Sequence, residues 1–394
     1  MSDFYDDFND STNSTSESEV SNNESNNNKS EDIKYQDLKL YLKKNDKNSK
    51  QKIENMERIR LRKKDKDKKT IEYTCFSSLN DTNYMIFGNK KGEVEIYDFN
   101  CNNDSSKNEN VYKYKLKLRI KTFYDEVQYI CELDEGFFAV SGSKNEIKIF
   151  ECKDNISKYS NIQTIDLNDD DSNIYSLISL PNFSSKEKRH FLCIATDKNI
   201  LIYKSNKIPK YLNISGNENN EDLSFELYKT IELFTLTHCL IEANNKYLVA
   251  ACPKEKAIKF FDMTNDFNLV ADIENINITN GSNIFTIIPN ENKLIVACND
   301  GFKMISIDEM KTFKSFHCKY RVLCLDKIDE NTFICCCSEK NKNIIKQYRI
   351  DKSNFEIKEI SQKKNKNNDE IWKIQKINEK IFFIDNQKSI IFFV

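Results

Sequence analysis

One pattern recurs seven times between residues 84 and 393: a very apolar strand-like segment, a short polar turn and a second strand-like segment. The first copy reads Met85–Gly88 and then Val94–Asp98, and the fourth reads Leu248–Cys252 and then Ile258–Asp262. The second segments end at residues 97, 150, 203, 261, 307, 348 and 393, so their spacings are 53, 53, 58, 46, 41 and 45 residues. A repeat of about 40–45 residues with four short strands per copy is the signature of a β-propeller blade. The pattern predicts an all-β fold, a seven-bladed β-propeller over residues 71–394.

Turn and strand-end residues in several copies give this pattern a family resemblance. They include SGSKN at residues 141–145, NDG at residues 299–301, and the aromatic–acid pairs Tyr97-Asp98 and Phe261-Asp262. With these features, residues 57–394 resemble a divergent seven-bladed WD40-repeat propeller. No copy carries Trp at the end of its third strand, and no Gly-His pair precedes a first strand. The Asp-His-Ser-Trp hydrogen-bond tetrad of that family is therefore largely absent, and we expect hydrophobic packing between blades to compensate.

The amino-terminal region divides into two segments of opposite charge. Residues 1–32 carry nine acidic residues against one lysine and few apolar residues, a composition that predicts a disordered tail over residues 1–50. Residues 43–69 carry thirteen Lys and Arg against five acidic residues. Within the basic linker 51–70, the alternation over residues 56–62 predicts a strand that closes the propeller by pairing with the last copy. The basic run 58–69 also fits an alternative role, as a nuclear-localisation or RNA-binding patch.

The scarcity of glycine and histidine excludes the common sequence motifs of catalysis. The seven glycines include no phosphate-binding loop and no G-x-G pair, and the three histidines form no H-E-x-x-H motif. None of the thirteen cysteines forms a C-x-x-C pair, and most lie in apolar alternation, as buried thiols do. We therefore expect no enzymatic activity, no cofactor, no metal and no small-molecule substrate.

The location of the protein is predicted from its cysteines and its amino terminus. Reduced, buried cysteines are typical of the cytoplasm or nucleus. Residues 1–10 are acidic and lack the apolar run of a signal peptide, and no stretch approaches 18 apolar residues. These features predict a cytoplasmic or nuclear protein, or one that occupies both compartments, with no membrane span.

The resemblance also implies where partners bind. In WD40-type propellers, proteins commonly engage one face through residues that flank the first aliphatic residue of each inner strand. In this chain the positions chosen on that basis are Gln128, Tyr175, Phe285, Arg321, Leu323 and Trp372. Aromatic and arginine side chains are frequent anchors of protein interfaces. They indicate other proteins as partners.

Three functional hypotheses follow. The favoured one is a non-catalytic scaffold that mediates protein–protein interactions within a multiprotein complex. The alternative is an RNA-associated propeller of ribosome biogenesis or RNA processing, which would bind RNA through residues 58–69. Lys and Arg total 60 against 62 Asp and Glu, so the chain lacks the global basic charge of a general nucleic-acid coat. A phosphoinositide-binding propeller is less favoured, because the F-R-R-G element of those proteins is missing.

Overall fold

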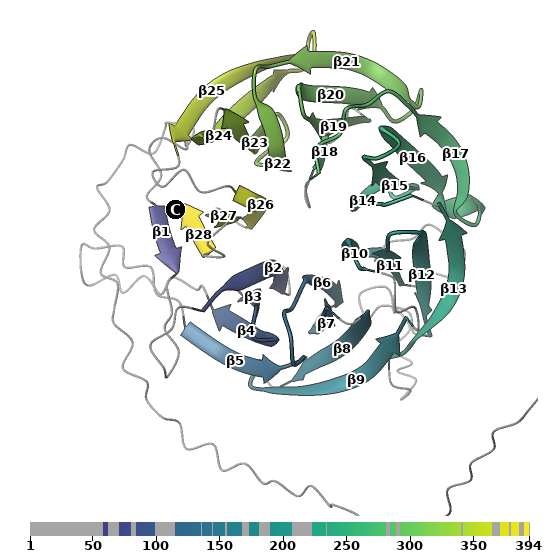
Figure 1. Cartoon of the computed structure of the whole chain (residues 1–394), viewed down its shortest axis with the longest axis vertical. Helices are drawn as coiled ribbons and strands as arrows, with labels where there is room; N and C mark the ends of the chain where they lie inside the picture. Colours follow the sequence, from purple (N-terminus) through teal and green to yellow (C-terminus); the bar gives the residue numbers. More distant parts are fainter. Residues whose placement is uncertain are drawn as a thin grey trace, which may run out of the picture. The chain divides into compact units, whose positions relative to one another are not determined.

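The computed structural model of the chain describes the strands and many of the turns between them (Figure 1). The described residues are 58–61, 71–79, 84–98, 115–134, 136–143, 145–153, 156–167, 173–180, 190–206, 223–233, 235–280, 284–288, 292–339, 342–364, 371–377, 380–385 and 390–393. The predicted disordered tail 1–50 and the basic run 62–69 lie outside these residues.

The described strands form seven four-stranded antiparallel sheets, which confirms the all-β prediction. In six of them the strands follow chain order from first to outer strand. The first three sheets are β2 (Tyr73–Leu79), β3 (Tyr84–Asn89), β4 (Glu93–Asp98) and β5 (Lys115–Lys121); β6 (Tyr129–Asp134), β7 (Phe137–Ser141), β8 (Glu146–Lys153) and β9 (Lys158–Asp166); and β10 (Ser176–Leu180), β11 (Phe191–Ala195), β12 (Asn199–Ser205) and β13 (Phe225–Glu232).

The next three sheets are β14 (Cys239–Ala243), β15 (Tyr247–Cys252), β16 (Ala257–Asp262) and β17 (Asn268–Ile273); β18 (Phe285–Ile288), β19 (Lys293–Cys298), β20 (Gly301–Ser306) and β21 (Lys311–His317); and β22 (Arg321–Lys327), β23 (Thr332–Glu339), β24 (Lys342–Asp351) and β25 (Glu356–Lys364). A short 3-10 helix, η3 (Met263–Asn265), joins β16 to β17.

The seventh sheet combines strands from both ends of the chain. Its order is β26 (Ile371–Ile377), β27 (Lys380–Asp385), β28 (Ile390–Phe393) and β1 (Arg58–Leu61). β1 pairs antiparallel with β28, with Arg58 opposite Phe393 and Leu61 opposite Ile390. β1 lies inside the basic linker 51–70, where the sequence predicts a closing strand.

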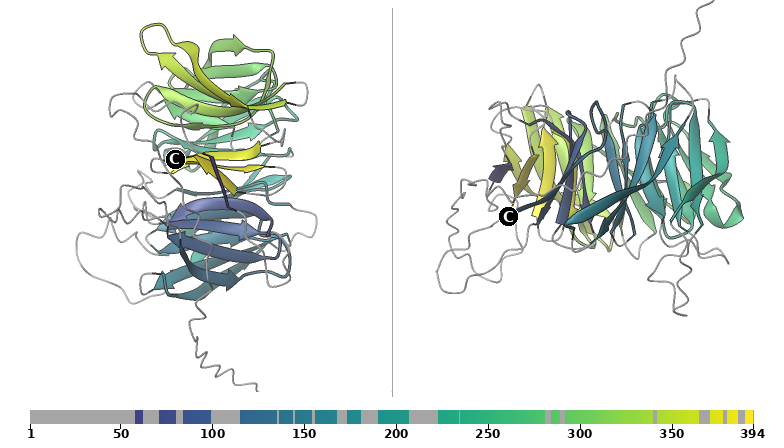
Figure 2. Two further views of the ribbon diagram at one scale, coloured as in Figure 1. Left: turned by 90° about the vertical axis from the view of Figure 1, so that its left-hand side faces the viewer. Right: turned by 90° about the horizontal axis from the view of Figure 1, so that it is seen from below.

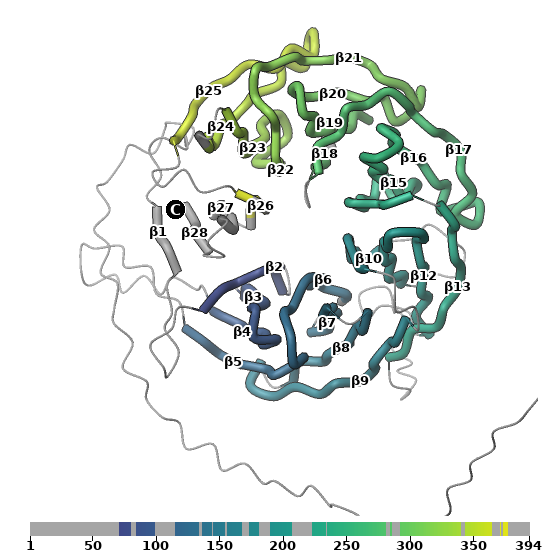
Figure 3. The backbone as a smooth tube through the Cα atoms, viewed as in Figure 1, coloured from purple at the N-terminus to yellow at the C-terminus, as the bar shows by residue number. Residues whose placement is uncertain are grey.

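The sheets pack face to face through their inner strands. The first strands contact one another in chain order, from β2 through β6, β10, β14, β18 and β22 to β26, and β2 also contacts β27 (Figures 1 and 3). Figure 2 shows the same sheets from two further directions. The strands inside each sheet have a neighbouring sheet on both faces. All five residues of β11, the second strand of its sheet, are therefore buried. The outer strand β5 instead alternates between exposed and more buried residues.

The hydrophobic core consists of several apolar clusters, which lie where neighbouring sheets pack against each other. One apolar cluster joins the β2–β5 and β6–β9 sheets through Ile86, Ile96, Ile130 and Phe138, and a larger one spans the β14–β17, β18–β21 and β22–β25 sheets. All twelve described cysteines are free and ten are buried, so the prediction that most act as small core residues is confirmed. Among the described residues, no helix is long and apolar enough to cross a membrane.

Candidate protein-interaction face

The predicted contact residues lie where the first strands of the sheets begin. Gln128 and Tyr175 immediately precede β6 and β10. Phe285 and Arg321 are the first residues of β18 and β22, and Leu323 and Trp372 lie two and one residues into β22 and β26. Each of these strands follows a loop that comes from the outer strand of the preceding sheet. We name these segments the connecting loops.

Tyr175 and Arg321 are accessible to solvent, and each also contacts a neighbouring residue. Tyr175 is half-buried, its backbone N–H donates to the Ala195 carbonyl at 2.8 Å, and its ring centroid lies 5.4 Å from that of His238. Burial and the nearby Lys254 ammonium lower the pKa of His238. Arg321 is exposed, and its Nε donates to Thr279 Oγ1 at 3.2 Å. An amphipathic ring and a guanidinium are thus held at two connecting loops.

The other predicted residues are less available to a partner. Phe285 is only 2 % exposed and packs in the largest apolar cluster. It is therefore a core residue and not the contact residue that the sequence predicts. Leu323 and Gln128 are half-buried, and the Gln128 backbone N–H donates to the Ser141 carbonyl at 2.9 Å. Trp372 belongs to β26, but its side chain lies outside the described part of the structure.

Tyr124 is a surface residue that the sequence reasoning missed. Its side chain is 95 % exposed, and it lies in the connecting loop between β5 and β6. That loop is bonded to the β3–β4 turn: the N–H groups of Thr122 and Phe123 donate to the Gly92 carbonyl at 2.9 and 3.0 Å. The Val127 N–H donates to the Asn89 carbonyl at 3.0 Å. The available signal was an aromatic residue within the polar segment between two strand-like segments.

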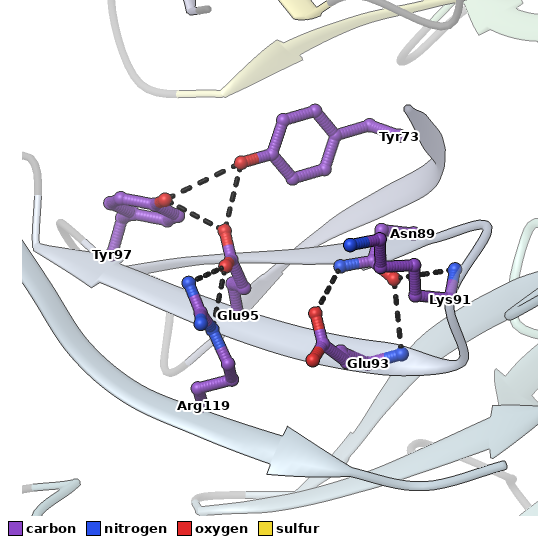
Figure 4. A network of polar contacts seen from close by, with 7 residues as sticks. All are labelled: Tyr73, Asn89, Lys91, Glu93, Glu95, Tyr97 and Arg119. Carbon is purple, nitrogen blue, oxygen red and sulfur yellow. Dashed lines mark hydrogen bonds and ion pairs between the residues drawn. The ribbon is translucent and has the colours of Figure 1, made fainter. Parts of the chain in front are cut away.

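The β3–β4 turn that supports this loop is itself fixed by a buried amide (Figure 4). Asn89 Oδ1 accepts from the N–H groups of Lys91 and Glu93 at 2.9 and 3.1 Å, and Nδ2 donates to the Glu93 carboxylate at 3.0 Å. Gly92 has φ of +72°, and a Cβ added there would lie 2.2 Å from the carbonyl oxygens of Phe123 and Asp125. Only glycine fits this turn without displacing the loop. Tyr124 is therefore presented on a well-supported backbone.

A charged network lies in the same sheet, also shown in Figure 4. The Glu95 carboxylate, fully buried, accepts from Tyr73 Oη at 2.8 Å, Tyr97 Oη at 2.7 Å and Arg119 Nε at 2.8 Å. Arg119 Nη2 makes a second contact with it at 2.6 Å. Burial and the Glu95 charge raise the pKa values of both tyrosines, so their hydroxyls stay protonated and donate. Because both oxygens of the Glu95 carboxylate accept hydrogen bonds from neighbours, the arrangement stabilises the sheet.

Comparison with known proteins identifies a propeller family. The family described as the NUP159/214 beta propeller matches residues 177–390, which is 214 of the 394 residues and more than half of the chain. The match supports a β-propeller family and does not identify WD40 repeats in particular. It begins within β10, so Tyr124 and the Glu95 network lie before the matched span. No curated protein matches this chain.

Proposed function

Since the chain belongs to the NUP159/214 beta-propeller family, we propose that it is a non-catalytic scaffold that binds other proteins within the nuclear pore complex. Membership in a nucleoporin propeller family suggests that the partners of this chain are other proteins of the pore. Nothing in the match favours RNA as the partner, and the basic run 62–69 lies outside the described residues.

The architecture that we propose is a propeller of seven blades, each formed by one four-stranded sheet. Support comes from the succession of contacts between first strands and from the contact of β2 with β27. In this arrangement, β1 completes the last blade through its pairing with β28. Closure of this kind covers the edge of β28 that would otherwise end the last sheet.

The family match carries the proposed function, and the observation that carries the binding face is Tyr124, a 95 % exposed aromatic side chain on a supported loop. A tyrosine on a supported backbone has only two side-chain torsions to fix when it enters a partner's pocket, and such residues are frequent hot spots. We propose that Tyr124, Tyr175 and Arg321 contribute to one partner-binding face formed by the connecting loops. Trp372 belongs to the same proposal through its position at the start of β26.

Affinity capture with the full chain and Tyr124→Ala tests this face. We expect recovery of the principal protein partners to fall at least tenfold, because loss of an aromatic hot spot costs about 2 kcal/mol or more. The melting temperature should not change, since Tyr124 is 95 % exposed. Tyr159→Ala on β9, where the tyrosine is 45 % exposed, is the matched control and should retain the partners.

Nuclease treatment and microscopy separate the scaffold from its rivals. Partners should persist after nuclease digestion, whereas loss of all of them would indicate an RNA-dependent association. A fluorescent fusion of the full chain should label the nuclear rim in discrete spots. A uniform signal in cytoplasm and nucleoplasm would contradict the pore location.

A further inference from the structure

In the six sheets whose strands follow chain order, the fourth strand is the outer one. Among these six outer strands, β5 has the highest positive charge. β5 reads KLKLRIK, with four basic residues and no acidic one. Its net charge, counted as Lys and Arg minus Asp and Glu, is therefore +4. Counted in the same way, the net charge is 0 for β9, −1 for β13, −1 for β17, +2 for β21 and +1 for β25. A strongly basic edge is therefore a local property of β5 and not a general property of the rim.

β5 also has an edge at which another strand could pair. It ends the sheet order β2-β3-β4-β5, and among the described residues it pairs with β4 only. Its basic residues alternate with Leu116, Leu118 and Ile120, of which the two leucines are half-buried and the isoleucine is buried. Such an edge offers backbone hydrogen bonds, a row of cations and a row of apolar side chains on the opposite face.

The carboxylates that contact these cations lie toward the interior of the sheet. Arg119 pairs with the fully buried Glu95, and Lys117 Nζ lies 3.3 Å from Asp98 Oδ2, whose side chain is only 18 % exposed. Lys121 Nζ donates to a carbonyl, that of Lys91, and Lys115 is exposed at the beginning of the strand. In the strand register, Lys115 lies opposite Asp98 and Lys121 lies opposite Glu93, so these carboxylates lie on the β4 side of the strand and not along its outer edge.

We propose that the β5 edge binds an extended, acidic segment of a partner protein by strand addition. Opposite charges facing each other across two strands are favourable, and like charges are unfavourable. A second copy of β5 would place four cations opposite four cations, so self-pairing is disfavoured. A segment in which Asp or Glu alternates with Val, Ile or Leu would match both rows of β5. A nucleic acid would match the cations only, since it has no peptide groups to extend the sheet.

This site adjoins the partner face at Tyr124, because Lys121 contacts the turn that supports that loop, and a peptide assay that needs no partner protein tests it independently. The probe is a fluorescein-labelled peptide in which four Glu alternate with Val and Ile, titrated into the full chain at low and high salt. A peptide of equal composition with its four Glu in one block is the sequence control, and a single-stranded RNA of equal charge is the second probe. Hydrogen exchange of residues 115–121 reports pairing along the edge.

The charge-reversal variant is Lys115→Glu with Lys121→Glu, and the matched control is Lys311→Glu with Lys314→Glu on β21, another basic outer strand. We expect the alternating peptide to bind, to slow exchange in β5, and to lose at least tenfold affinity in the β5 variant only. If the variant has a lowered melting temperature, Lys115→Gln with Lys121→Gln replaces it. Equal binding of the block peptide, tighter binding of the RNA, or the absence of peptide binding would each overturn the proposal.

Discussion

The Glu95–Arg119 pair supports a quantitative prediction, because its two members differ greatly in burial. The Glu95 side chain is 0 % exposed, whereas the Arg119 side chain is 41 % exposed. If Glu95 is replaced by Gln, water can hydrate the guanidinium that remains. If Arg119 is replaced by Leu, a buried carboxylate remains beside the uncharged hydroxyls of Tyr73 and Tyr97 and loses its cation. The second change should therefore be the more damaging.

The expected magnitudes follow from the groups left behind. Breaking a buried ion pair so that one charge remains uncompensated costs about 3–5 kcal/mol, which we assign to Arg119→Leu. Weakening hydrogen bonds to a charged group costs about 1.5–3 kcal/mol, and Glu95→Gln keeps some of them, so we expect about 1–2 kcal/mol. At about 2 °C for each kcal/mol in a protein of this size, the melting temperature falls by about 6–10 °C and about 2–4 °C, respectively.

Thermal unfolding followed by circular dichroism measures these shifts. The matched control is Lys117→Leu on the same strand, whose partner Asp98 lies 3.3 Å away and is 18 % exposed, so water can hydrate the carboxylate that remains and the change should cost less than about 1 kcal/mol. The double variant Glu95→Gln with Arg119→Leu should melt above Arg119→Leu alone, because it removes the uncompensated charge. The reasoning fails if Arg119→Leu costs no more than Lys117→Leu, or if the second substitution lowers the melting temperature further.

Three further predictions concern other parts of the molecule. Gly92→Ala should lower both the melting temperature and partner recovery in affinity capture, because a Cβ there meets the carbonyls that support the Tyr124 loop. Burial lowers the pKa of His190 to about 4, below its usual value of about 6.5. Its contribution to stability is therefore complete above about pH 6.5 and is lost as the pH falls toward 4, so His190→Gln should reduce the acid dependence of the melting temperature between these values. Deletion of residues 1–50 should leave the melting temperature and solubility unchanged, whereas deletion of residues 1–69 removes β1 from β28 and should lower both; equal behaviour of the two truncations would contradict a stabilising role for β1.

The strands could be predicted from the sequence because their signal is local. Apolar runs such as Leu294–Cys298 and the turns that follow them recur along the chain, and the structure places β19 over Lys293–Cys298. The Glu95 network could not be predicted in this way. In Val94-Glu95-Ile96, alternation indicates an outward-facing carboxylate, yet Glu95 is fully buried. Its burial depends on tertiary packing around Tyr73 and Arg119, and the alternation of β4 alone carries no information about these distant residues.

The candidate face was predictable only in part for the same reason. The position of Arg321 at the start of β22 follows from the repeat, and the structure finds its side chain exposed. Phe285, the first residue of β18, is buried, because a residue near a strand start can face either solvent or the contact between sheets. Tyr124 was overlooked because its exposure depends on hydrogen bonds to a turn about 30 residues earlier, at Asn89 and Gly92.

The pairing of β1 with β28 has a consequence for the order of events during synthesis. Residue 58 emerges from the ribosome long before residue 393, its partner, has been added to the chain. At about 5–20 residues added per second, the intervening 335 residues take roughly 17–67 s to translate. Sheets such as β6–β9 need only a contiguous part of the chain and can form during that interval. The seventh sheet is therefore completed last, and until then β1 must remain unpaired with β28 while the rest of the protein assembles.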